Sequence, residues 1–112
     1  MRNRNKYGAR KTRLDGFTFD SQKEAGRWGQ LVIMERVGHI SDLQRQVPYI
    51  LVPAEDGPDG KRLRELRYVA DFVYKDVRGN THVEDVKGFR TKEYLIKKRL
   101  MWYLYKIPVE EI

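Results

Sequence analysis

The chain has 112 residues, a formal net charge of +7 and no cysteine. This length predicts one compact domain with a modest core, and the lack of cysteine excludes disulfides and thiolate metal sites. Two isolated histidines, His39 and His82, argue against a histidine-based zinc site, and no apolar run approaches the length of a membrane span, so we expect a cytoplasmic protein without a membrane partner.

Basic residues gather near the two ends of the sequence. Residues 1–16 are predicted to form a basic arm that stays disordered until it binds DNA, and residues 17–112 a single domain. The stretch 87–106 is also strongly basic, whereas the residues between the two are net acidic. Basic ends that neutralise phosphates around an acidic, metal-holding centre favour an enzyme acting on DNA, although the cations could simply keep exposed faces soluble. The arm residues expected to contact DNA are Arg2, Arg4, Lys6, Arg10, Lys11 and Arg13.

The first predicted helix begins at Ser21 and runs to about Val37. Residues 21–24 (SQKE) have the pattern of a capping box, and Gly38 is a typical helix terminator. Glu24 lies beside the apolar stripe of this helix, so we expect it at the rim of the core rather than in open water.

Residues 43–53 are predicted to form a strand, in which Pro48 indicates an edge position or a bulge. Gln44 and Gln46 share one face of this strand. Residues 54–64 contain two glycine-rich turn signals, which are typical of a mobile connection.

A β-hairpin is predicted next, from strands at 66–75 and 81–86 and a turn at residues 78–80 (RGN). A three-residue loop centred on Gly79 places Val73 opposite Asp85 and Asp71 opposite Lys87, so that the two acids and the lysine converge. A two-residue loop sends Asp71 to the other face.

Asp71, Asp85 and Lys87 are the residues most suggestive of chemistry. Asp85 and Lys87 are two apart on one strand face, and Asp71 lies among apolar residues, where an unpaired carboxylate is costly. Paired carboxylates hold a hard cation such as Mg²⁺, and a lysine can orient the attacking water. The alternative is a set of solvated charges on a half-exposed strand. Glu84 points to the opposite face, where we expect a structural partner such as an arginine.

Residues 91 to about 106 are predicted to form a second helix that Thr91 caps and Pro108 stops, followed by a short strand at 109–112. Its expected buried stripe is Ile96, Leu100, Tyr103, Leu104 and Ile107, and Trp102 is also expected in the core. The residues expected to face DNA, together with Thr91, are Tyr94, Lys97 and Lys98. The alternative is a solvated helix face.

Asp71, followed after a hairpin-length gap by residues 85–87 (DVK), resembles the PD-(D/E)XK nuclease signature, with Ala70 in place of its proline. A longer series of segments resembles a family of small phage-encoded proteins that is placed among these enzymes, near the Holliday-junction resolvases. These segments are residues 19–25, residues 38–40, Leu43 with Gln46, residues 68–72, residues 83–88, and Thr91 with Tyr94 and Lys97.

The resemblance implies a restriction-endonuclease-like α/β fold, a mixed β-sheet of about four strands flanked by helices. It also implies a DNA endonuclease that uses Mg²⁺ or Mn²⁺ and no small-molecule cofactor. Asp71 and Asp85 would bind the metal, Glu24 would complete the site directly or through water, and Lys87 would position the attacking water. Gln46 would help to fix the lysine or the water. Two readings stay open beside these roles: Glu24 closes the capping box, and Gln44 takes the place of Gln46, which is then a plain edge residue.

The expected substrate is branched, Holliday-junction-like DNA in phage recombination or replication, which places the protein in the host cytoplasm. Symmetric cutting of two strands needs two active sites, so a homodimer is expected. Two other functions stay open. One is a restriction-like or recombination nuclease on linear DNA, and the other is a non-catalytic basic nucleic-acid-binding module.

Overall fold

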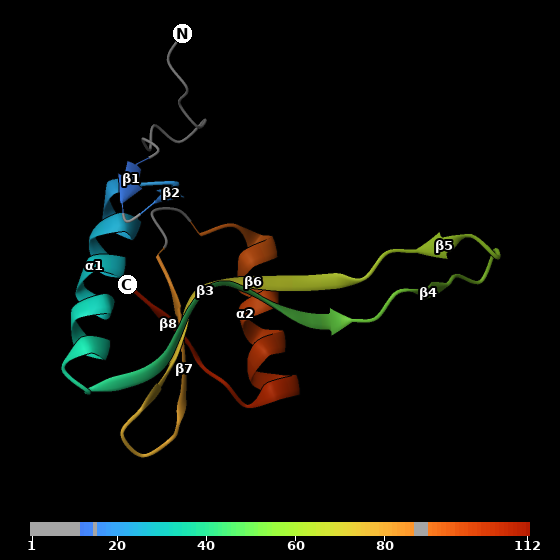
Figure 1. Cartoon of the computed structure of the whole chain (residues 1–112). Helices are drawn as coiled ribbons and strands as arrows, with labels where there is room; N and C mark the ends of the chain where they lie inside the picture. Colours follow the sequence, from blue (N-terminus) through green and yellow to red (C-terminus); the bar gives the residue numbers. More distant parts are fainter. Residues whose placement is uncertain (1–11, 15, 87–89) are drawn as a thin grey trace, which may run out of the picture.

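A four-stranded mixed sheet flanked by two helices forms the centre of the protein (Figure 1). The computed structural model describes residues 12–14, 16–86 and 90–112. The strand order is β3 (Ile40–Val52), β6 (Leu66–Asp76), β7 (Thr81–Asp85) and β8 (Val109–Glu111), with β8 parallel to β7 and the other neighbours antiparallel. The α/β fold with a mixed sheet of four strands and flanking helices is therefore confirmed.

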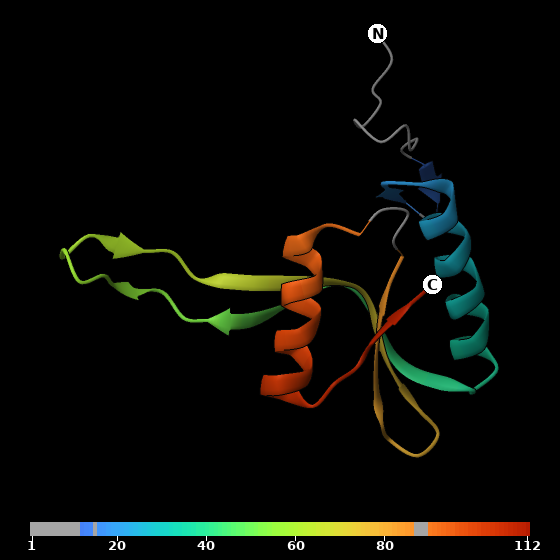
Figure 2. The same ribbon diagram turned by 180° about the vertical axis from the view of Figure 1, so that it is seen from behind.

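The two helices cover opposite faces of the sheet, α1 (Gln22–Arg36) on one side and α2 (Lys92–Tyr105) on the other (Figures 1 and 2). Each face has its own apolar core. The core beneath α1 includes Phe19, Trp28, Leu31, Phe72 and Tyr74, and the core beneath α2 includes Tyr68, Val83, Tyr94, Met101 and Val109. Burying one large apolar side chain stabilises the fold by about 1.5–3 kcal/mol, so each helix is held mainly by its core. Among the described residues, no helix is long and apolar enough to cross a membrane.

Helix α1 begins and ends where local signals in the sequence predict. The Ser21 hydroxyl accepts a hydrogen bond from the Glu24 amide at 3.1 Å, which satisfies one of the free N–H groups of the first turn. Gly38 follows the helix with a φ of +84°, a left-handed conformation that glycine adopts without steric cost. The predicted helix is confirmed.

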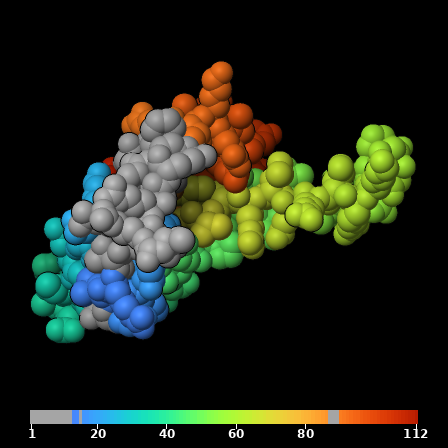
Figure 3. Space-filling view, turned by 90° about the horizontal axis from the view of Figure 1, so that it is seen from above, coloured from blue at the N-terminus to red at the C-terminus, as the bar shows by residue number. Residues whose placement is uncertain are grey.

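Residues 54–64 differ from the mobile connection expected. They form a two-stranded ribbon in which β4 (Glu55–Asp56) pairs with β5 (Arg62–Leu63). This ribbon prolongs β3 and β6 into an arm that projects from the body of the molecule (Figures 1 and 3). We call residues 50–66 the β-arm. The Tyr105 hydroxyl of α2 fixes its base by donating a hydrogen bond of 2.6 Å to the Ile50 carbonyl.

A second short ribbon precedes α1. Strand β1 (Thr12–Leu14) pairs with β2 (Phe17–Phe19), and Gly16 turns between them with a φ of +81°. Part of the segment predicted as an N-terminal arm is thus paired with the first residues of the domain. The residues before 12 lie outside the part of the chain that the structure describes.

The β6–β7 hairpin forms with a register different from the one expected. Val73 pairs with Val83, not with Asp85, because the loop is residues 77–79 and the Asp76 amide donates to the Asn80 carbonyl. The Asp76 carboxylate determines this turn by accepting hydrogen bonds from the amides of residues 78 and 80, at 2.9 and 3.0 Å. The shift is two residues, so the face on which each side chain lies is unchanged.

Helix α2 is capped as predicted but packs through a different face. The Thr91 hydroxyl accepts from the Tyr94 amide at 3.0 Å. The buried residues are Tyr94 and Met101, whereas Ile96 is 61% exposed and Tyr103 is 67% exposed. The predicted buried stripe is therefore wrong for Ile96, Tyr103 and Leu104, and Trp102 is exposed as well.

Candidate active site at the end of the β6–β7 ladder

Asp71 and Asp85 meet where β6 and β7 separate. The last pair of the ladder is Phe72 with Glu84, and one further step of the same register places Asp71 opposite Asp85. Asp71 Oδ2 accepts a hydrogen bond of 2.7 Å from the Val86 amide. Asp85 is 1% exposed, and its Oδ2 accepts from the Tyr68 hydroxyl at 2.5 Å. The observed register thus keeps the two aspartates on one face, and both carboxylates are held in position by hydrogen bonds.

Glu24 brings a third carboxylate to this region from the first turn of α1. Its side chain is 4% exposed, and burial raises its pKa from 4.5 to about 7. The negative charges of Asp71, Asp20 and Asp85 raise the pKa further, while Arg45 lowers it. The carboxyl groups of α1, β6 and β7 therefore share one electrostatic environment.

Gln46 connects β3 to this group of acids. Its Nε2 donates to Glu24 Oε1 at 3.5 Å, so Gln46 is the glutamine of β3 that reaches the acidic centre. It lies between the pairs Arg45–Phe72 and Val47–Ala70, at the level of Asp71 on β6. Gln46 also has a φ of 54°, a left-handed conformation that costs a residue other than glycine about 1–3 kcal/mol. Such strain is often found at functional sites.

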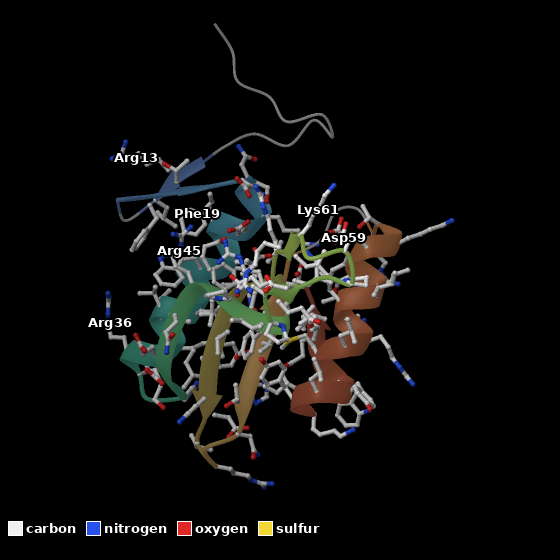
Figure 4. The ribbon with its side chains drawn as sticks, turned by 90° about the vertical axis from the view of Figure 1, so that its right-hand side faces the viewer. Arg13, Phe19, Arg36, Arg45, Asp59 and Lys61 are labelled. Carbon is white, nitrogen blue, oxygen red and sulfur yellow. The ribbon has the colours of Figure 1, made fainter. Side chains whose placement is uncertain are left out.

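Arg45 lies next to this group of acids, and the sequence alone did not identify it as a site residue. Its guanidinium lies 4.8 Å from the Phe17 ring centroid and 4.9 Å from that of Phe19. Figure 4 shows Arg45 beside Phe19. The β1–β2 ribbon thus orients the cation that partly compensates Glu24.

Glu84 has the structural role expected of it. Its two carboxylate oxygens accept hydrogen bonds from Arg27 Nε and Nη2, at 2.7 and 2.6 Å, and one of them also accepts from the Tyr74 hydroxyl. This fork joins α1 to β7 on the face away from Asp85, and it raises the pKa of Arg27 above its usual range. Arginine is confirmed as the partner of Glu84.

The carboxylate oxygens at this site suit a hard divalent cation that takes only a few of its ligands from the protein. Among the residues that the structure describes, no group of three or more histidine, cysteine, aspartate and glutamate side chains is arranged to hold a metal ion. Asp71 and Asp85 could offer oxygen ligands from adjacent strands, since Mg²⁺ commonly binds one or two carboxylates and keeps several waters. The negative charge that raises the pKa of Glu24 is also what a cation would offset.

The other predicted site residues fall into two groups. Lys87 and the cations from Arg2 to Lys11 lie outside the described residues, and Arg13 is exposed on β1. Tyr94 is 5% exposed and donates to Glu111 Oε2 at 2.7 Å, so it faces the core rather than a solvent-facing partner. Lys98 bonds the same Glu111 oxygen at 3.1 Å, while Lys97 pairs with Glu93 at 3.0 Å.

Tyr68 and Glu111 were missed because their contacts join distant parts of the chain. Tyr68 reads as an ordinary strand aromatic, yet it orients Asp85 across the ladder. Glu111 reads as a terminal charge, yet it accepts from Tyr94 and Lys98. No local pattern marks either residue, because their partners lie on other elements of the fold.

Comparison with known proteins gives one match. No curated protein and no solved structure matches the chain. One family model, described as "Protein of unknown function (DUF1064)", matches residues 4–109, which is nearly the whole length. The chain belongs to this family, Protein of unknown function (DUF1064).

Proposed function

We propose that this protein is a DNA endonuclease that uses Mg²⁺ or Mn²⁺ to hydrolyse phosphodiester bonds in branched, Holliday-junction-like DNA. The observation that carries the proposal is the meeting of Asp71 and Asp85 at the end of the ladder, with Glu24 in the same electrostatic environment. A phage role in recombination or replication, in the host cytoplasm, fits the sequence resemblance.

Each residue of the site has a distinct task in this proposal. Asp71 and Asp85 would hold the cation, which would polarise the phosphate and lower the pKa of a bound water. The Val86 amide and the Tyr68 hydroxyl fix the two carboxylates so that little reorganisation is needed. Gln46 holds Glu24, whose pKa of about 7 suits a group that takes up or releases a proton near neutral pH. Lys87 would position the water.

The charge distribution supports a nucleic-acid substrate. The chain carries a net charge of +7 although its centre is acidic, so the cations of both ends can neutralise phosphates around the site. Two symmetric cuts in a junction require two sites, and a homodimer supplies them.

A non-catalytic nucleic-acid-binding module is the second candidate, because α2 presents exposed aromatics beside a cation. Trp102 is 48% exposed and Tyr103 is 67% exposed, and Lys106 Nζ lies 5.6 and 5.7 Å from their ring centroids. Such a surface could stack on bases without cutting a strand.

A substrate comparison separates these functions. Labelled four-way junction, linear duplex and single strand are incubated with Mg²⁺ and either wild-type protein or the Lys87→Ala variant. Paired nicks near the branch that disappear in the variant support the proposal. Equal cutting of linear duplex moves the function to a restriction-like or recombination nuclease. Binding without any cutting, unchanged in the variant, favours the binding module.

A further inference from the structure

A cavity of about 250 Å³ lies between β6 and the first turns of α2, beside the candidate active site. The residues that give it its character are Arg67, Tyr68, Thr91, Glu93, Tyr94 and Lys97. Figure 3 looks towards this side, where the surface of α2 meets that of β6 near the base of the β-arm.

Tyr68 joins the cavity to the site. It lines the cavity and at the same time donates its hydroxyl proton to the hydrogen bond with Asp85. The β6–β7 pairs end at Phe72, so β6 continues from Asp71 back to Arg67 along the cavity. These four steps along the strand span about 13 Å, or about four phosphates of one strand at 3.4 Å each along a duplex axis. A DNA strand bound at the aspartates therefore reaches the cavity within a few nucleotides.

The charges at the cavity favour an anion. Arg67 is exposed at its edge, and Lys97 pairs with Glu93, whose side chain is 77% exposed. An exposed pair of this kind contributes about 0.2–1 kcal/mol, so a phosphate can replace Glu93 at Lys97 with little loss. The Tyr94 hydroxyl is already hydrogen-bonded to Glu111. Its ring therefore forms, with Tyr68 and Val69, an uncharged side of the cavity. Cations above an apolar wall match a phosphate and its deoxyribose.

We infer that Arg67 and Lys97 bind a phosphodiester of the substrate strand a few nucleotides from the cleaved bond. This inference rests on the proposed function and adds to it a second contact point, with Arg67 as a residue that places the strand. It also means that the bound strand runs from the aspartates towards the β6–α2 cavity.

The test is DNA binding without cleavage. Affinity for a labelled four-way junction is measured in Ca²⁺ at several NaCl concentrations between about 50 and 200 mM. Loss of one phosphate contact lowers the slope of log affinity against log salt by about one charge. We expect this decrease in Arg67→Ala and in Lys97→Ala. The matched control is Arg78→Ala, which removes the same charge from the exposed β6–β7 turn at the other end of the hairpin and should leave the slope unchanged.

A second measurement locates the contact and does not depend on comparing the stability of variants. Single phosphates of the junction are replaced in turn by neutral methylphosphonates. Wild-type protein should lose affinity at one position near the branch, where Arg67→Ala, which keeps only the Lys97 contact, should lose clearly less. Equal losses in both proteins at every position would overturn the inference.

The outcomes distinguish this inference from the proposed function. Slopes equal to wild type in Arg67→Ala and Lys97→Ala remove the cavity as a phosphate site and leave the cleavage proposal standing. If the salt slope decreases in Arg67→Ala as expected but the wild-type protein cuts no DNA in Mg²⁺, the proposed cleavage is wrong and the phosphate site remains.

Discussion

Glu24 has a carboxyl group whose pKa is raised to about 7, and its titration should be visible in the stability of the protein. The folded protein keeps this proton up to a pH of about 7, because its pKa is raised by burial and by Asp71, Asp20 and Asp85, whereas the unfolded chain loses it near 4.5. The unfolded state thus binds fewer protons in this window, and the free energy of unfolding falls as pH rises from about 4.5 to 7.

Glu24→Gln should remove this pH dependence. Above pH 7 the variant should be more stable than wild type by up to roughly 3 kcal/mol, the value of the whole pKa shift, and near pH 4 the difference should vanish. Urea unfolding of both proteins at several pH values measures this difference in the free energy of unfolding. Glu65→Gln, a change of the same kind at an exposed position, should follow wild type. A Glu24→Gln protein with the same pH slope as wild type would contradict the buried, charged environment assigned to Glu24.

The hydroxyl group of Tyr68 should contribute to the stability of the fold. Tyr68→Phe keeps the buried ring but leaves Asp85, 1% exposed, without this donor. A hydrogen bond to a charged group contributes about 1.5–3 kcal/mol, so urea unfolding should show a loss of that size. Tyr105→Phe removes a hydroxyl that bonds the Ile50 carbonyl at an exposed position, and it should cost less. Equal losses in the two variants would show that Tyr68 does not support a charged Asp85.

At the scale of elements, His82 links the β6–β7 turn to β8 at the end of the sheet away from the site. Its two ring nitrogens lie 2.8 Å from Asp76 Oδ2 at the turn and 2.8 Å from Glu110 Oε2 on β8. These carboxylates raise the pKa of His82 above its usual 6.5, Asp76 most strongly. A raised histidine pKa means that the added stability is fully present below pH 6.5 and is lost as pH rises through the folded value.

His82→Gln should therefore flatten the stability profile above pH 6.5. Thermal unfolding of wild type should show a decrease of the midpoint as pH rises from about 6 to 9, and the variant should start lower and change less. His39→Gln, at an exposed position after α1, serves as the control and should retain the decrease. A wild-type midpoint that rises with pH through this range would contradict the ion pairs assigned to His82.

The elements also show which parts of the fold a sequence reveals. Helix α1 was predicted because its signals are local: Ser21 caps it and Gly38 ends it. The register of β6 and β7 was missed because the Asp76 carboxylate, not the RGN triplet alone, shapes the turn. The buried face of α2 was missed because Glu111, on a strand that follows the helix, draws Tyr94 and Lys98 towards the sheet.

The same distinction applies to the candidate site. Asp71 and Asp85 could be found because acids in apolar strands at hairpin spacing form a local pattern, and an error of two residues in register leaves their shared face unchanged. Tyr68 and Arg45 could not be found, because each acts on a residue of another element. Short-range patterns thus indicate the acids, whereas the groups that orient them depend on tertiary packing.

At the scale of the whole molecule, the site lies where α1, β3, β6 and β7 meet, with α2 and the β-arm to one side (Figure 1). Acids gather at this centre while cations dominate the two ends of the chain. In the proposed function, the cations would attract a polyanion while the central acids would hold a divalent cation. The central claim is that Asp71 and Asp85 form the metal-dependent site of DNA cleavage.

The measurement that tests this claim most directly is the single-turnover cleavage rate of a labelled four-way junction in Mg²⁺ and in EDTA. Wild type and the Asp42→Asn control, an exposed acid on β3, should cut at similar rates in Mg²⁺ and not at all in EDTA. Asp71→Asn and Asp85→Asn should each be slower by at least about a hundredfold, since metal catalysis contributes several kcal/mol. Wild-type rates in Asp85→Asn, or cutting that persists in EDTA, would contradict the claim.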